Sequence, residues 1–153
     1  MTAGFLVAPR EGDSVWSIGG RFTRKVGGSD SGGRLSILEA VVTRTAEPRR
    51  HIHHREDEAF YILSGELLIE CEGEAAPHRV PAGGFFFGAR GRRHSIRNVG
   101  DQPARVLVLA APSCGLDQMF AELDAATAGG VPDIGALAAI CAKYGVAIEP
   151  PTT

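Results

Sequence analysis

The chain has 153 residues, of which 44% are hydrophobic and 22% charged, a composition typical of one folded domain with a core of ordinary size. Its net charge of −2 provides no basic surface for a phosphate backbone, so we expect no nucleic-acid partner. No apolar stretch approaches the ~18 residues of a membrane helix, and residues 1–9 lack the basic leader of a signal peptide. We therefore expect a cytoplasmic protein with no membrane partner.

Short segments rich in β-branched and aromatic residues, separated by glycine and proline, fill the first two thirds of the chain. The glycine-rich segment 27–33 lacks the Lys-Ser/Thr pair of a phosphate loop, so we interpret it as a flexible hairpin connection. Many short strands with glycine turns indicate an all-β sandwich or barrel. The expected strands are 34–44, 59–64, 66–72, 84–87 and 105–111.

The pattern changes after Pro112. Leu116, Phe120 and Leu123 recur at helical spacing, and Pro132–Asp133 can start a second helix that ends near Gly145. We expect these two short helices to pack on the barrel, with the lining or covering of a pocket as the alternative. The organisation predicted is one domain over 1–153, with a barrel core at about 34–111 and a helical tail at about 116–145.

The three cysteines, Cys71, Cys114 and Cys141, are odd in number and form no CxxC pair. This spacing predicts neither a disulfide framework nor a cysteine-rich zinc site. We interpret each cysteine as a small buried hydrophobic residue.

Three histidines lie within four residues, and they are the most informative feature of the chain. In an extended segment His51 and His53 point to one face and His54 to the other, so the first two can converge on one ion. The acidic run 56–58 can supply a carboxylate, although the residue types alone do not decide which one. Alternation places Glu58 on the inward face of a strand, where a carboxylate is costly unless it is paired or bound to metal. A solvated charged loop is the competing interpretation.

Two longer patterns around these residues resemble the motifs of the cupin superfamily. The first motif, G-x5-H-x-H-x(3,4)-E-x6-G, matches from position 45 to Gly65, with Thr45 in place of the leading glycine. The second, G-x5-P-x-G-x2-H-x3-N, matches from Gly83 to Asn98, with Ala89 in place of the proline. Neither departure falls on a ligand position. The segment 53–67 also resembles the small bacterial cupins likened to quercetin 2,3-dioxygenase.

The resemblance implies a jelly-roll-like antiparallel β-barrel that binds one divalent ion of Fe, Ni, Mn, Cu, Co or Zn. It further implies a homodimer, which exposed strand edges would suit. His54 and His78 have no place in either motif, and we interpret them as exposed residues. The implied metal ligands are His51, His53, Glu58 and His94.

This resemblance favours a dioxygenase that acts with O₂ on an enolic or aromatic, flavonol-like small molecule. Glu58 could serve as general base as well as ligand, provided that burial raises its pKa toward neutrality. The inward residues Phe60, Phe85, Phe87 and Ile96 are expected to line the substrate pocket, with a role in the barrel core as the alternative. A non-oxidative cyclase, isomerase or lyase and a non-catalytic small-molecule-binding cupin are the competing functions.

Overall fold

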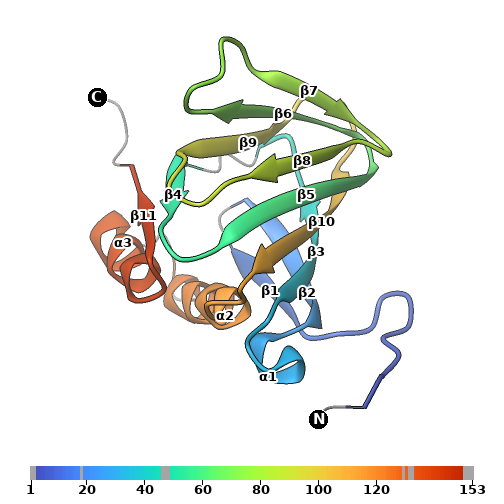
Figure 1. The fold of residues 1–153 in the computed structure, drawn as a ribbon, viewed down its shortest axis with the longest axis vertical. Helices are drawn as coiled ribbons and strands as arrows, with labels where there is room; N and C mark the ends of the chain where they lie inside the picture. Colours follow the sequence, from blue (N-terminus) through green and yellow to red (C-terminus); the bar gives the residue numbers. More distant parts are fainter. Residues whose placement is uncertain (1–2, 18, 46–48, 129, 131–132, 150–153) are drawn as a thin grey trace.

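The computed structural model describes residues 3–17, 19–45, 49–128, 130 and 133–149. Its strands form two antiparallel sheets, and a pair of helices lies at one end of them (Figure 1). Within the described residues, no helix is long and apolar enough to cross a membrane.

The larger sheet has six strands in the order β1-β2-β3-β10-β5-β8, and the smaller has five in the order β11-β4-β9-β6-β7. The six are β1 (Ser14–Ser17), β2 (Gly20–Val26), β3 (Ser36–Val42), β10 (Ala104–Ala111), β5 (Asp57–Ser64) and β8 (Phe85–Gly88). The five are β11 (Val146–Ile148), β4 (His51–His53), β9 (His94–Asn98), β6 (Glu66–Cys71) and β7 (His78–Pro81).

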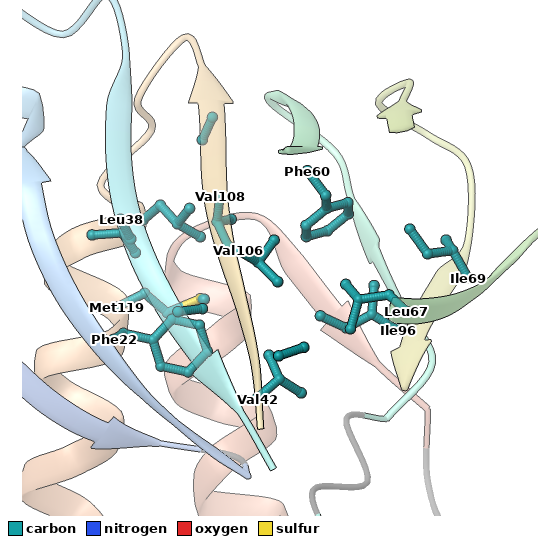
Figure 2. Close-up of a cluster of buried hydrophobic side chains, with 14 of the residues drawn as sticks. Phe22, Leu38, Val42, Phe60, Leu67, Ile69, Ile96, Val106, Val108 and Met119 are labelled. Atoms are coloured by element: carbon teal, nitrogen blue, oxygen red, sulfur yellow. The ribbon is translucent and has the colours of Figure 1, made fainter. Parts of the chain in front are cut away.

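The hydrophobic core lies between the two sheets, as Figure 2 shows for its labelled side chains. Strand β3 is typical: Leu38, Ala40 and Val42 are buried, while the residues between them are only partly covered. This period of two follows from the pleat of a strand, which sends successive side chains to opposite faces. Phe60 and Val108 contribute to the core from the neighbouring strands β5 and β10.

The expected all-β class and antiparallel pairing are confirmed, but the described strands remain two sheets and do not close into one barrel. Closure of the barrel therefore stays a prediction. The sequence also left β1, β2, β7 and β11 unassigned, and it gave no bounds for β4 and β9. The segment 27–33 does connect the hairpin of β2 and β3, but it contains one helical turn, α1 (Gly28–Ser31).

The two expected helices are present as α2 (Leu116–Thr127) and α3 (Ile134–Lys143). Asp133 caps α3 by accepting a hydrogen bond from the backbone N–H of Gly135 at 3.0 Å, whereas Pro132 lies outside the described residues. Gly145, with φ of 79°, ends the helical segment as predicted. The chain then continues directly into β11, which pairs with the histidine strand β4.

Candidate metal centre

The four residues of the expected ligand set meet where the two sheets face each other. His51 and His53 lie on β4 and His94 on β9, all in the five-stranded sheet, while Glu58 comes from β5 in the opposite sheet. Each offers one ligand atom, and these four atoms all lie within 4.8 Å of one another. The backbone pairing of His51 with His94 sets these two rings side by side, with centroids 4.5 Å apart.

All three imidazoles direct Nε2 toward one carboxylate oxygen. Glu58 Oε2 lies 2.9 Å from Nε2 of His94, 3.1 Å from that of His53 and 3.7 Å from that of His51. The opposite nitrogen of each ring faces an acceptor: Nδ1 lies 2.8 Å from the carbonyl oxygen of Arg49 for His51, and 3.2 Å from that of Arg92 for His94. A carbonyl oxygen can only accept, so Nδ1 donates and the Nε2 lone pair is directed inward.

This arrangement fits a divalent cation. Lone pairs of three imidazoles and a carboxylate repel one another unless a proton or a metal ion lies among them. His53 Nε2 is buried, and it has no partner with hydrogen-bond geometry among the described residues. The donor set of three neutral nitrogens and one oxygen suits Zn and the redox-active first-row ions. The cluster can therefore bind a metal ion, and the donor types leave its identity open.

The protonation of the cluster follows from its burial and its charges. Burial opposes a charge on His53, but the Glu58 carboxylate and the hydrogen bonds to Glu56 and Glu58 outweigh it and raise the His53 pKa to about 10. Burial likewise opposes the charge of Glu58, yet the three histidines hold its pKa well below the usual range. Glu58 is therefore ionised, which suits a ligand.

The C-terminal strand holds the histidine strand in place. β4 pairs with β9 only through His51, and its other edge pairs with β11 over all three of its residues. Two further backbone hydrogen bonds close the adjacent turn, from His54 N to Gly145 O at 2.9 Å and from Gly91 N to His53 O at 2.7 Å. The segment that follows α3 is thus part of the site's framework.

A largely apolar cavity of about 70 Å³ adjoins the cluster, room for roughly two water molecules. Residues of the helical tail line this cavity together with residues of the sheets. The alternative expectation for the two helices, that they line a pocket, is therefore confirmed. Beside the cluster, Arg49 is the one charged residue of the lining. The apolar lining residues are Phe22, Phe60, Ile96, Val108, Leu116, Met119, Phe120, Cys141, Val146 and Ile148.

Two of the four expected pocket residues, Phe60 and Ile96, line this cavity. The inward orientation expected of Phe85 and Phe87 is wrong, because both are more than half exposed, at 59% and 58%. In the register of β8 with β5, Phe86 lies opposite the buried Phe60, and its two neighbours therefore point outward.

The remaining sequence expectations have mixed outcomes. His54 and His78 are exposed, as expected. The three cysteines are free thiols, and Cys141 is buried as predicted. Cys71 and Cys114 are only half-buried, so the interpretation of all three as buried residues is wrong for these two. Burial, and then the nearby Glu56 carboxylate, raise the pKa of the Cys114 thiol.

Two polar residues beside the centre were not singled out in the sequence. Glu56 is buried against His53, with its Oε1 2.5 Å from Nδ1. Arg49 adjoins His51 and lines the cavity. Glu56 belongs to the acidic run, but the turn that carries it has no regular alternation that would predict which carboxylates face inward.

Two antiparallel sheets with a buried three-histidine, one-glutamate cluster define a small, β-rich, metal-binding protein. The family profile described as "Cupin domain" matches residues 38–110, which include all four members of the cluster. A solved structure with a similar fold is that of KdgF from Halomonas sp., with a TM-score of 0.63 and 22% identity, covering 75% of this chain and 99% of that one. The profile match and the similar fold together support a small protein of the cupin superfamily.

Two curated relatives share a shorter segment. The chain is 36% identical over 62 residues to the tetracenomycin polyketide synthase protein TcmJ of Streptomyces glaucescens, covering 40% of each protein. It is 34% identical over 62 residues to the polyketide synthase CurC of Streptomyces cyaneus, covering 40% of this chain and 39% of that protein. The chain thus spans about two fifths of the length of these relatives.

Proposed function

We propose that this protein is a metal-dependent enzyme that acts on a small enolisable carbonyl compound of the polyketide type. The observation that carries the proposal is the convergence of three Nε2 lone pairs and the Glu58 carboxylate at one end of an apolar cavity. A divalent ion bound there would supply Lewis acidity, which favours the enolate form of a carbonyl substrate.

The substrate class rests on two further considerations. The similar proteins TcmJ and CurC carry polyketide synthase names, and polyketide chains contain alternating carbonyl groups with acidic C–H bonds between them. Arg49 offers a guanidinium at the cavity lining, where it would pair with an enolate or carboxylate oxygen of the substrate. The apolar lining would exclude water around that ion pair and so strengthen it.

In the proposed enzyme, the main role of Glu58 is that of a metal ligand. A general base works best with a pKa near the working pH, and the surroundings of Glu58 lower its pKa instead. The role of Glu58 as base therefore stays a prediction, and the Glu58→Gln variant tests it. Turnover with full metal binding in that variant would exclude the role.

A dioxygenase is the second candidate function. The apolar lining of the cavity favours it, because O₂ is small and apolar and would partition into such a space. A flavonol is much larger than the cavity of about 70 Å³ and would not lie wholly within it. A small enolic substrate would be enclosed more completely.

One experiment separates these functions. Protein loaded in turn with Fe(II), Ni(II), Mn(II), Co(II) or Zn(II) is mixed with a 1,3-diketone, and separately with quercetin. Deuterium exchange at the α-carbon is measured together with O₂ uptake, using metal-free protein and the His51→Ala variant as background.

Metal-dependent exchange without O₂ uptake would support the proposed non-oxidative chemistry. Stoichiometric O₂ consumption would establish the dioxygenase in its place. Loaded protein that shows neither response would overturn the proposal and favour a small-molecule-binding cupin.

A further inference from the structure

Glu56 is a buried carboxylate beside the metal centre that no cupin motif includes. It lies in the turn between β4 and β5, where its side chain is 1% exposed. Its Oε1 lies 2.5 Å from Nδ1 of His53, on the far side of the ring from Glu58. Its Oε2 is buried, without a hydrogen-bond partner among the described residues.

This environment distinguishes His53 from the other two histidines. Nδ1 of His51 and of His94 each faces a neutral backbone carbonyl, at 2.8 and 3.2 Å. Nδ1 of His53 faces a carboxylate at a shorter distance. A charged acceptor makes a stronger hydrogen bond and withdraws more of the proton from the ring, which increases electron density at the opposite nitrogen.

The turn that carries Glu56 is held on both sides. Backbone hydrogen bonds fix the end of β4: Gly91 N donates to His53 O, and His54 N donates to Gly145 O. Next to Glu56, the guanidinium of Arg90 donates to the carbonyl oxygen of Arg55 at 3.3 Å. These bonds fix the backbone that leads into Glu56 and so favour its position beside His53.

A carboxylate enclosed in this way is costly for folding unless both of its oxygens have partners, and Oε2 has none with hydrogen-bond geometry among the described residues. A hydrophobic residue of similar size would fill the same turn at lower cost. Such a retained cost is typical of functional sites.

We propose that Glu56 is a positioning residue of the metal centre: it accepts the Nδ1 proton of His53, directs Nε2 of that ring at the ion, and strengthens its bond to the metal. The inference rests on the metal centre of the proposed function, but on neither its substrate nor its reaction. It makes His53 the most strongly donating of the three imidazoles. It also adds a second negative charge close to the ion.

The test uses Zn(II), which is diamagnetic, and the whole chain. Zn(II) affinity is measured by chelator competition in wild type, Glu56→Ala and Glu56→Gln. Asp101→Asn is the control, because Asp101 is an exposed carboxylate that pairs with Arg44 at the surface, outside both the cluster and the turn that carries Glu56. Imidazole N–H protons of the Zn(II)-loaded proteins are observed by ¹H–¹⁵N NMR, and unfolding of the metal-free proteins checks that each variant folds.

Glu56→Ala is expected to weaken Zn(II) binding about 10- to 100-fold, the usual effect of losing such a partner. Glu56→Gln retains an acceptor oxygen but no charge, so its loss of Zn(II) affinity should be several-fold smaller. Asp101→Asn should bind Zn(II) as wild type does. In wild type the His53 Nδ1–H should be the furthest downfield of the ring N–H signals. It should move upfield in Glu56→Gln and exchange away in Glu56→Ala.

Folded Glu56 variants with wild-type Zn(II) affinity and an unshifted His53 signal would overturn the inference while leaving the metal centre intact. If Glu56→Ala does not fold, the isosteric Glu56→Gln carries the same test through its NMR shift and its affinity. Wild-type protein that binds no Zn(II) would overturn the metal centre and this inference together.

Discussion

The metal centre and strand β8 distribute polar and apolar side chains in opposite ways. At the centre His94 and Glu58 are almost fully buried, at 1% and 5% exposure. On β8 two phenylalanines are more than half exposed. From hydrophobicity alone, one would expect the phenylalanines to be buried and the polar side chains to be exposed. The comparison teaches that strand register decides which face a side chain occupies, and that burying polar groups against their preference indicates a function.

The two regions also differ in what holds them. The centre draws on both sheets and on β11, so its side chains are fixed from several directions. Among the described strands, β8 lies at the edge of its sheet and pairs with β5 alone. Changes at the centre should therefore alter both function and stability, while changes on the outer face of β8 should alter neither.

The largest effect is expected from removing a ligand. His94→Ala should weaken the binding of a divalent ion by more than the ~10- to 100-fold typical of an outer partner, because it deletes one of four donors. Metal content after dialysis, measured by mass spectrometry, checks the prediction. His78→Ala, at an exposed histidine outside the cluster, is the control and should retain the wild-type metal content. Equal metal in both variants would contradict the assigned centre.

The next effect concerns the core next to the centre. Phe60 is 2% exposed, and its ring lies 6.0 Å from that of His94 between centroids. Phe60→Ala should lower the free energy of unfolding by about 3–5 kcal/mol, because it leaves a cavity in the core. Chemical denaturation of the metal-free protein measures this. A loss below about 1 kcal/mol would mean that the site collapses around the missing ring.

The third effect depends on pH. Burial disfavours the charged form of His53, but Glu58 and Glu56 raise its pKa from 6.5 to about 10 in the folded chain. This contribution to stability is fully present below pH 6.5 and is lost as the pH rises toward 10. Between these values the melting temperature of the metal-free protein should fall by several degrees. Zn(II)-loaded protein should not show this fall, because the ion replaces the proton at His53. An equal fall of the melting temperature with pH in the metal-free and Zn(II)-loaded forms would contradict the raised pKa of His53 as the cause.

The sequence was sufficient for the class of fold, which depends on local periodicity, and for the cluster, which the resemblance to the cupin motifs implied. Alternation in the acidic strand placed Glu58, Phe60 and Ile62 on one inward face, and all three are buried. The motif spacing identified the residues that the fold brings within ligand distance.

What the sequence could not provide depends on long-range pairing. The side to which the FFF run of β8 turns is set by its register with β5, which local patterns do not contain. Strand β11 is too short to recognise, and its pairing with β4 and the burial of Val146 both involve residues far away in the sequence. The backbone that leads into Glu56 is likewise held by the 89–91 turn and by the segment after α3, which are far away in the sequence.

The smallest effect is expected on the outer face of β8. In the double variant Phe85→Ser plus Phe87→Ser, each site should change the free energy of unfolding by no more than about 0.5 kcal/mol, because both rings are already in contact with water. Metal affinity should equal that of wild type, since Phe86 still packs against the core and keeps the strand in place. Denaturation and chelator competition measure both quantities. A large loss of stability would show that the two rings are covered in solution. Sedimentation of the wild type would then decide whether a second copy of the chain covers them, as in the expected homodimer.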